Sequence, residues 1–413
     1  MHLIVTSNMP IKLVRLFLTL STVFLTAPGH ALPYTPTNDA EVVERLPGRA
    51  SDPATRRVES LRKQLAARPD DARVRVDIAR RYFDMAMAQG DPRYAGYAAG
   101  ALAPLLKAVP SEPAMAAAYY QARGMIEQFS HAFDPALVSL AKASELNPAS
   151  PEPLLWRSAI FMVQAKYAQA AAECAKLTPL AETLVGIGCS AFAESSHNGG
   201  LGAAFEKLAA AVKVHDDSAP ELLLWEYTRL AEMAWRLERF DAAENYYQNA
   251  FKLGITDQYL LGSYADFLLF KKRPKEVLVL LADWERSDIL LLRLALAAKQ
   301  SNDARAADLA TQLRTRFRDA AKRGDRLHEQ EAARFELDIE QNPKKALVLA
   351  SANYSIQKEP RDAEILMRAA LSPVNAGDAK QARPALAWWR ETSYQDPHIH
   401  QLATQLIGQG AEK

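Results

Sequence analysis

The sequence predicts an all-α fold, a solenoid of antiparallel helical hairpins, and three observations support this prediction. Over residues 227–253, apolar and small residues recur at the spacing of two short amphipathic helices. Only Leu237, Glu238 and Arg239 separate these helices, which leaves room for little more than a tight reversal. Related patterns recur along the chain, whereas the alternation of Val, Ile and Thr that is typical of strands is absent. One hairpin leaves an apolar face uncovered, so neighbouring hairpins must stack on it.

A signal peptide is expected over residues 1–31. Two basic residues, Lys12 and Arg15, precede an apolar run over 16–27, whose length suits a secretory signal better than a membrane span. Small residues at the −3 and −1 positions lead us to expect cleavage after Ala31. The mature protein is then periplasmic or secreted, and the form of the signal suggests a bacterial periplasm. The alternative is an uncleaved membrane anchor.

The charge of the chain argues against binding to nucleic acid. The full sequence has 50 Lys and Arg and 49 Asp and Glu. Without Lys12 and Arg15 the counts are 48 and 49, a net charge of −1. Domains that bind nucleic acid usually carry a clear positive excess. The basic stretch 314–326 is interpreted as a solvated helix face followed by a turn. We expect no nucleic-acid partner, and no membrane span in the mature form.

The helical repeats are expected to begin at residue 53, after a proline-containing leader over 32–52. A single apolar stripe follows the leader and is typical of a capping or partial repeat. Residues 72–107 form a diverged repeat whose reversal falls at 90–92. The TPR-like repeats, named below for the family they resemble, are expected over 53–284.

The clearest repeats lie within residues 117–284, where four patterns keep a common register. Residues 195–200 form a loop that is long for a helical hairpin, and it is either a functional excursion or tolerated slack. Over 285–413 the patterns weaken, but small residues still recur about every 35 positions. This part is expected to form diverged helical repeats and a C-terminal cap.

These patterns resemble the tetratricopeptide repeat (TPR), a 34-residue helix–turn–helix unit. That family places small residues at positions 8, 20 and 27 and large apolar residues at 4, 7, 11, 17 and 24; position 11 of the central hairpin is Ala234, which is smaller than usual. The matching residues of the central hairpin are Tyr227, Leu230, Ala231, Phe240, Ala243, Tyr247 and Ala250. The resemblance covers roughly residues 72–390 and implies a right-handed superhelical solenoid. It says less about function, because the family binds very different partners.

In the resembling family, the first helices of the repeats line a concave groove that binds a partner. The residues carried over to the groove mix aromatic, Met and polar side chains, which suits a protein or peptide. The alternative for Trp225 and Trp235 is that they pack against neighbouring helices. The Lys and Asn residues with which some relatives bind a C-terminal carboxylate are missing from these positions. The implied groove residues are Gln121, Met125, Gln128, Phe129, Met162, Trp225, Glu232, Trp235, Arg236, Asp266 and Phe270.

The two cysteines, Cys174 and Cys189, fall on helices that pack together in this architecture. An oxidising compartment permits a disulfide between them. Closing this ~15-residue loop would add on the order of 3 kcal/mol in the chain-entropy model. Two buried free thiols are the alternative, because Cys suits small apolar sites.

The sequence offers no recognisable catalytic, metal or cofactor motif. Residues 186–191 superficially fit a dinucleotide-binding loop, but they fall within a helical pattern instead of after a strand. His398 and His400 lack a convergent third ligand in the sequence. We therefore expect a non-enzymatic scaffold or adaptor of the bacterial cell envelope, with no metal and no cofactor.

Two alternatives to a scaffold remain open. The chain could be a small-ligand-binding sensor, or an accessory subunit of an envelope enzyme or transporter, which a buried pocket with convergent polar groups would favour. It could also self-associate through its terminal repeats, which an apolar face on the last helix would favour.

Overall fold

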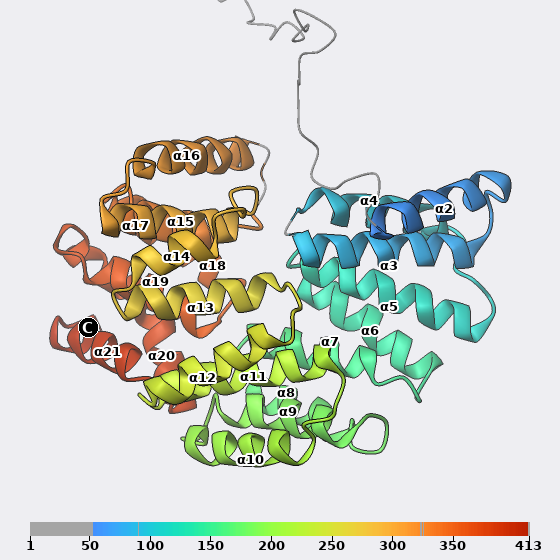
Figure 1. The fold of residues 1–413 in the computed structure, drawn as a ribbon, viewed down its shortest axis with the longest axis horizontal. Helices are drawn as coiled ribbons and strands as arrows, with labels where there is room; N and C mark the ends of the chain where they lie inside the picture. Colours follow the sequence, from blue (N-terminus) through green and yellow to red (C-terminus); the bar gives the residue numbers. More distant parts are fainter. Residues whose placement is uncertain (1–52, 90, 323, 325, 412–413) are drawn as a thin grey trace, which may run out of the picture. The chain divides into compact units, whose positions relative to one another are not determined.

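The computed structural model describes residues 53–89, 91–322, 324 and 326–411. The signal peptide and leader expected over 1–52 lie outside the described residues. Within the described ranges, all regular secondary structure is helical (Figure 1). None of the described helices is both long and apolar enough to cross a membrane.

The first part of the fold is a lead helix followed by stacked hairpins. The diverged repeat expected over 72–107 forms a hairpin that ends in a short 3-10 turn. The elements are α2 (Pro53–Ala67), α3 (Ala72–Gln89), α4 (Arg93–Leu102), η1 (Ala103–Leu106), α5 (Pro113–Phe129), α6 (Phe133–Leu146), α7 (Glu152–Val163) and α8 (Tyr167–Ala175).

The middle of the chain continues the same hairpins. The central hairpin has its turn at residues 237–239, as the sequence predicts. The elements are α9 (Thr183–Glu194), α10 (Leu201–Val214), α11 (Pro220–Arg236), α12 (Phe240–Lys252), α13 (Gln258–Phe270), α14 (Pro274–Leu280), α15 (Asp288–Ser301) and α16 (Ala306–Lys322).

The C-terminal part is helical as expected, but its last elements differ from the sequence pattern. A 3-10 stretch, η2, precedes helix α20, and a further helix, α21, follows α20. Asp396 starts α21 by accepting hydrogen bonds from two backbone amides, and Pro397 suits its first turn. The elements are α17 (Glu329–Asp338), α18 (Pro343–Tyr354), α19 (Pro360–Leu371), η2 (Pro373–Ala382), α20 (Arg383–Thr392) and α21 (Pro397–Gly408).

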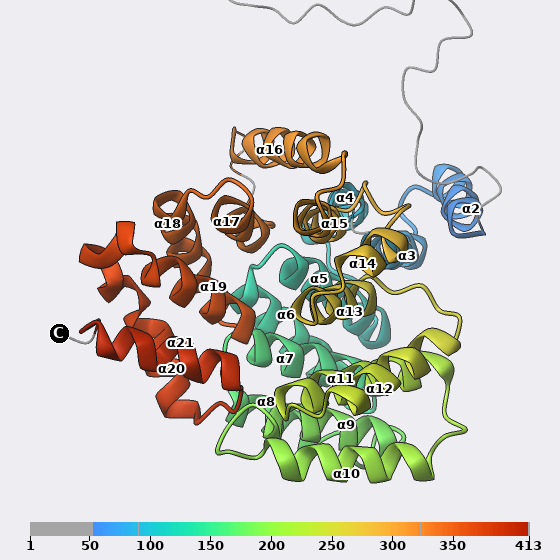
Figure 2. The same ribbon diagram turned by 60° about the vertical axis from the view of Figure 1, so that its left-hand side comes forward.

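The helices form two layers along the solenoid. From α3 to α17, each odd-numbered helix packs on the helix that follows it, and from α3 to α19 successive odd-numbered helices contact one another (Figures 1 and 2). The odd-numbered helices therefore line the inner face. The winding is tight, because α13 also contacts α3, and Gln258 Nε2 donates to Met87 O at 3.2 Å.

The hairpin turns share one construction. In each of five turns, a residue with left-handed backbone ends the first helix, and the next amide bonds back to a carbonyl five residues earlier. This is the Schellman arrangement, which satisfies carbonyls left open at the helix end. In the central hairpin the left-handed residue is Glu238, and Arg239 N donates to Ala234 O at 2.8 Å. The other left-handed residues are His131, Ala165, Lys272 and Asn302.

Small residues allow the paired helices to approach closely, as the repeat pattern predicts. Ala231 and Ala243 of the central hairpin are fully buried. In the hairpin of α5 and α6, a Cβ atom added to Gly124 would lie 2.6 Å from Leu140 Cγ, which is far inside a normal contact. Larger side chains at these positions would push the helices apart.

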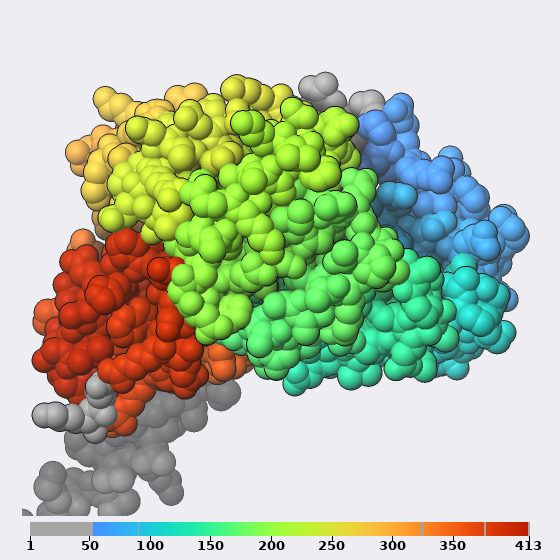
Figure 3. All heavy atoms as spheres, turned by 90° about the horizontal axis from the view of Figure 1, so that it is seen from below, coloured from blue at the N-terminus to red at the C-terminus, as the bar shows by residue number. Residues whose placement is uncertain are grey.

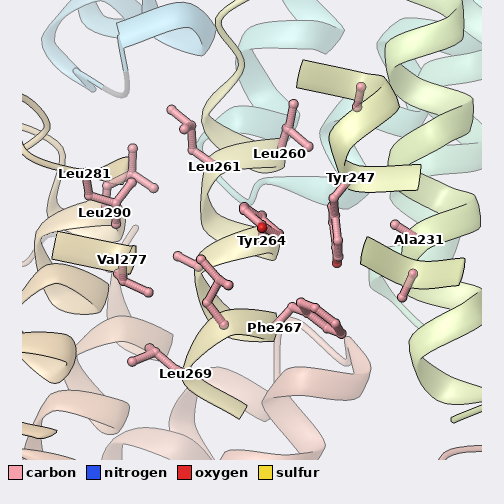
Figure 4. Close-up of a cluster of buried hydrophobic side chains, with 14 of the residues drawn as sticks. Ala231, Tyr247, Leu260, Leu261, Tyr264, Phe267, Leu269, Val277, Leu281 and Leu290 are labelled. Atoms are coloured by element: carbon pink, nitrogen blue, oxygen red, sulfur yellow. The ribbon is translucent and has the colours of Figure 1, made fainter. Parts of the chain in front are cut away.

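The largest buried cluster lies where α11 to α15 meet (Figure 4). Tyr247 of α12 packs against Tyr264 and Phe267 of α13, with ring centroids 5.2 and 5.6 Å apart. Val277 of α14 and Leu290 of α15 cover the other side of α13. Each such side chain contributes about 1.5–3 kcal/mol by burial. This cluster fixes α13, which carries several residues of the inner face.

The C-terminal helices pack back on the hairpin of α7 and α8. Tyr167 lies in one buried cluster with residues of α18 to α21, and its hydroxyl accepts a hydrogen bond from Trp388 Nε1 at 3.0 Å. Lys358 N donates to Val163 O at 2.7 Å. In the space-filling view, the C-terminal helices (red) adjoin the green to yellow-green middle of the chain (Figure 3). The solenoid therefore covers part of its own inner face.

A disulfide joins two consecutive hairpins. Cys174, near the end of α8, is bonded to Cys189 of α9, and their Cα atoms are 5.5 Å apart. Leu154 and Leu177 bury the bond, and Trp225 of α11 packs against this group.

Candidate functional site

An exposed aromatic group lies at the end of α13 and is called the aromatic patch here. Phe270 packs against Trp235 of α11 and Phe240 of α12, with ring centroids 5.4 and 5.7 Å away. Lys271 Nζ lies 4.3 Å from the centre of the Phe240 ring. Phe270 nevertheless remains 46% exposed. The patch adjoins a shallow surface depression lined by Glu238, Arg239, Phe240, Asp241, Ala242 and Lys271.

A second group, the inner polar cluster, comprises Arg229, Glu232, Tyr259 and Ser263 on α11 and α13. Glu232 Oε1 accepts hydrogen bonds from the Tyr259 hydroxyl at 2.6 Å and from Ser263 Oγ at 3.0 Å. Arg229 Nη1 donates to Glu232 Oε2 and to Tyr259 Oη at 3.1 and 3.0 Å. Tyr259 is 53% exposed, so water and a partner can both reach it. The surrounding protein and the negative Glu232 raise the pKa of Tyr259 above its ordinary value.

A third group, the arginine cluster, comprises Arg293, Arg334 and Arg361 around Asp266. One residue comes from each of four successive inner helices, α13, α15, α17 and α19. Asp266 Oδ2 lies 2.8 Å from Arg293 Nη2, and Oδ1 lies 2.7 Å from Arg334 Nη1. Arg361 also donates to Asp266 Oδ2. Burial lowers the pKa of Arg293 to about 9, with the neighbouring Arg334 acting in the same direction.

Acidic residues at the start of α19 lie beside these groups. Glu359 N donates to Asp362 Oδ2 at 2.9 Å, and Asn353 Nδ2 donates to Asp362 Oδ1 at 2.7 Å. Burial and the nearby Glu359 raise the pKa of Asp362 to about 8. Burial also raises the pKa of Glu359, and Glu232 and Glu331 add to this. These acids therefore hold protons more readily than exposed carboxyl groups do.

Arg236, another residue implied for the groove, contacts the C-terminal part of the same chain. Its guanidinium donates to Ser195 O at 2.6 Å and to Gln395 O at 3.0 Å, and lies 4.0 Å from the centre of the Tyr394 ring. The long loop over 195–200 is bound to the same segment, because Asn198 N donates to Thr392 O at 2.7 Å. This loop therefore anchors the C-terminal hairpin.

The remaining implied residues lie elsewhere. Gln121 and Met125 are buried in the N-terminal hairpins. Met162 is buried against the C-terminal helices. Gln128, Phe129 and Trp225 are half-buried, and the Phe129 ring lies edge-on to Phe83 with centroids 6.1 Å apart. The structure brings together Trp235 and Phe270 in the aromatic patch, and places Glu232 and Asp266 in the two polar groups.

Four arginines of the inner face were not anticipated from the sequence. Arg229 occupies a repeat position that the family does not use for its groove. The repeat pattern therefore gave no reason to expect it on the inner face. Arg293, Arg334 and Arg361 lie in the diverged half, where the repeat register is lost. Only the curvature of the solenoid brings them to Asp266.

The two histidines near the C-terminus contact different residues of the chain. His398 Nε2 lies 3.4 Å from Glu364 Oε1, and His400 packs against the Trp389 ring with centroids 5.5 Å apart. In the described part of the chain, no group of three or more His, Cys, Asp or Glu residues is arranged to hold a metal ion.

Comparisons with known proteins give limited similarity. No protein-family model matches the chain, and no curated protein matches it. Among solved structures, the APC/C hetero-tetramer Cut9-Hcn1 is 16% identical with a TM-score of 0.37, over 76% of this chain and 52% of that one. Yeast Tom70 is 14% identical with a TM-score of 0.41, over 87% and 86%. The human IFIT1 dimer with PPP-AAAA is 12% identical with a TM-score of 0.41, over 87% of each chain.

The chain spans about half the length of the Cut9 complex chain that it matches. The assignment of the fold rests on the hairpins themselves. Their paired packing, shared turn construction and small residues at close approach are the features that the repeat resemblance implies. The described residues therefore form a TPR-like, all-α solenoid of helical hairpins.

Proposed function

We propose that this chain is a non-catalytic scaffold that binds a protein or peptide partner on the inner side of α11 and α13. The observation that carries the proposal is a pair of exposed aromatic side chains on one inner helix. Tyr259 and Phe270 lie at opposite ends of α13 and are 53% and 46% exposed. Large aromatic residues of this kind supply most of the binding energy in many protein interfaces.

Both aromatic side chains are held in place before any partner binds. Hydrogen bonding between the Tyr259 hydroxyl and Glu232 fixes the tyrosine, and the rings of Trp235 and Phe240 support Phe270. A side chain that is already ordered loses little entropy on binding, so more of its contact energy appears as affinity. This arrangement favours a binding role over simple packing for Phe270.

An extended partner fits this surface better than a small ligand does. Small-ligand sites are usually enclosed and bury most of the ligand. The depression beside Phe240 and the one lined by Trp389, Tyr394 and His400 are both shallow and open. Helical solenoids bind extended partners along such surfaces without an enclosed pocket.

The proposal places the protein in a bacterial cell envelope, on the strength of the N-terminal signal pattern. Cell fractionation and N-terminal sequencing of the purified protein test this part. Recovery from the periplasm or medium with an N-terminus at Leu32 supports it. Recovery from the cytoplasm with the first residues intact contradicts it.

Cross-linking in the native host tests the binding role. The tagged protein is mildly cross-linked and its partners are identified by mass spectrometry, beside a Trp235→Ala/Phe270→Ala variant. Tyr97→Ala is the matched control, because Tyr97 is a 55% exposed aromatic residue of α4 that also packs on other rings. Circular dichroism confirms that each variant is folded.

A partner lost from the double variant and kept by the control supports the proposal. A partner kept by both variants contradicts the site. Cross-links between copies of this chain alone would favour self-association instead.

A further inference from the structure

The contact between α9 and α11 encloses an acid without a partner. Glu226 of α11 is fully buried, and among the described residues neither of its carboxyl oxygens has a hydrogen-bond partner. The carboxyl lies directly against Gly188 of α9, where an added Cβ atom would overlap it. The absence of a side chain at Gly188 therefore makes room for the carboxyl. Without hydrogen bonds, a buried carboxyl is much less costly when it carries a proton than when it is charged.

The helices nearest to Glu226 offer little that would stabilise its charged form. On its own helix, the Arg229 guanidinium attracts the carboxylate, but it already donates to two residues of the inner polar cluster. On α9, Cys189 is held in the disulfide and does not titrate. Glu194, near the end of α9, pairs with Lys207 of α10.

The other two helices that pack on α11 do not supply a partner either. The hydroxyl of Tyr247 on α12 is hydrogen-bonded to Ser263, and the hydroxyl of Tyr259 on α13 donates to Glu232. Among the described titratable groups of α9, α10, α12 and α13, none acts on Glu226. Burial raises the pKa of Glu226 to about 8, and Arg229 offsets this only in part. The carboxyl therefore holds its proton at neutral pH.

The contacts around Glu226 determine which pair of helices can separate. Cys189 follows Gly188 directly and is bonded to Cys174, so the disulfide ties α9 to α8. Within the described ranges, no disulfide or ion pair joins α9 to α11. Beyond the end of α9, Ser195 O accepts a hydrogen bond from Arg236 of α11 at 2.6 Å. A charge on Glu226 would therefore part α9 from α11, with this hydrogen bond holding their far ends.

The next contact along the same two helices leads to the proposed binding surface. Arg229 lies about one helical turn beyond Glu226. Its guanidinium is 3.7 Å from the centre of the Phe192 ring of α9 and 5.0 Å from the centre of the Tyr259 ring. It also donates to the Tyr259 hydroxyl at 3.0 Å. Movement of α9 away from α11 would remove the Phe192 ring from Arg229 and so loosen the support of Tyr259.

We propose that the contact between Gly188 and Glu226 is a pH-sensitive joint, closed when Glu226 is protonated and opened when it ionises. The open joint admits water to the carboxylate and weakens the binding of a partner at Tyr259. The opening of the joint concerns this chain alone, whereas its effect on a partner rests on the proposed function.

The direction and size of the pH effect follow from proton linkage. The closed joint holds the proton up to about pH 8, whereas an exposed glutamate releases it near pH 4.5. Between these values, opening becomes about tenfold more favourable for each pH unit, and above pH 8 it changes little.

Hydrogen exchange measured by mass spectrometry between pH 5 and 9 tests the joint. The ratio of exchange rates in the wild type and Glu226→Gln cancels the intrinsic pH dependence of exchange. Below pH 8, this ratio is expected to rise by up to about tenfold per pH unit for amides of α9 and α11. It should stay constant for α3 and α5, because a solenoid opens locally. An equal rise throughout the chain, or a constant ratio everywhere, would overturn the joint.

Gly188→Ala tests the contact from the other helix. Its methyl group takes the place of the carboxyl, so the joint should be open at every pH. Gly202→Ala of α10 is the matched control, because a Cβ atom there meets no neighbouring group within 4 Å. At pH 6, amides of α9 and α11 are expected to exchange about tenfold faster or more in Gly188→Ala than in the control. Equal exchange would refute the contact, and if Gly188→Ala does not fold, the comparison with Glu226→Gln decides.

The effect on binding is measured by repeating the cross-linking in host cells held at pH 6 and at pH 8.5. The wild type should recover several-fold less partner at pH 8.5, whereas Glu226→Gln should recover equal amounts. Equal recovery by the wild type, despite exchange that shows an open joint, would break the link between the joint and binding. No partner at either pH would contradict the proposed function and leave the joint standing.

Discussion

The guanidinium of Arg236 lies 4.0 Å from the centre of the Tyr394 ring and joins the central hairpin to the C-terminal one. The two residues are far apart in the sequence, yet they meet because the solenoid winds back on itself. Hydrogen bonds to Ser195 O and Gln395 O reinforce the contact, and a longer one of 3.5 Å reaches Ser195 Oγ. Arg236 therefore fixes the position of the helices that border the inner face.

Replacing Arg236 should loosen the C-terminal hairpin. Arg236→Ala removes two charge-assisted hydrogen bonds and a cation–π contact, so we expect a loss of about 2 kcal/mol in the free energy of unfolding. Urea unfolding measures the loss, and hydrogen exchange locates it. Backbone amides of α20 and α21 should exchange faster. Arg305→Ala, at an exposed ion pair with Asp303, is the control, and equal exchange in the two variants would refute the role of Arg236.

Stability should depend on pH through Glu226 of α11. This carboxyl is fully buried, neither oxygen has a hydrogen-bond partner, and it lies against Gly188 of α9. Burial raises its pKa to about 8, from an ordinary value of 4.5. The folded protein therefore keeps a proton that the unfolded chain releases between these values. The contribution of protonated Glu226 to the free energy of unfolding is fully present below about pH 4.5 and is lost as the pH rises to about 8.

Glu226→Gln removes this dependence, since glutamine does not titrate. Between pH 5 and 9, the wild type should lose several kcal/mol relative to the variant, on the order of 3. Asp362 has a raised pKa too, and it is present in both proteins, so the comparison cancels its effect. Denaturant unfolding at a series of pH values measures the difference in free energy of unfolding between the two proteins. A constant difference between the two proteins would show that Glu226 is ionised in the fold.

The disulfide between Cys174 and Cys189 should protect both sulfurs from labelling. Maleimide treatment of the denatured, unreduced protein is expected to give no adduct, and reduction should allow two. Cys174→Ser/Cys189→Ser should lower the free energy of unfolding by about 3 kcal/mol, because the ~15-residue loop is no longer closed. Two adducts before reduction would restore the alternative of free thiols.

The individual hairpins could be predicted from the sequence. The central turn at 237–239, the buried Ala231 and Ala243, and the helical state of the C-terminal part all follow from local periodicity and small-residue spacing. Such signals are local, so a single sequence carries them. The 3-10 stretch η2 was missed because it lies within the weakly patterned part of the repeat resemblance, and helix α21 was missed because it lies beyond residue 390, where that resemblance ends.

The arrangement of the inner face could not be read from the sequence. Trp388 and Tyr167 are 221 positions apart, and Arg361 and Asp266 are 95 apart. Both contacts depend on the accumulated rotation of many hairpins, which no local pattern specifies. For this reason the residues implied for the groove do not form one surface. Arg236 and Met162 contact the C-terminal part, whereas Trp235 and Phe270 meet in the aromatic patch.

Photo-cross-linking from Tyr259 tests the central claim most directly. A benzophenone amino acid replaces Tyr259 on the inner face, or Tyr97 on α4 as the control, in the protein expressed in its native host. We predict that irradiation attaches a partner at position 259 and none at position 97. Adducts at position 97 alone, or at neither position while the protein is folded and exported, would contradict a partner-binding inner face.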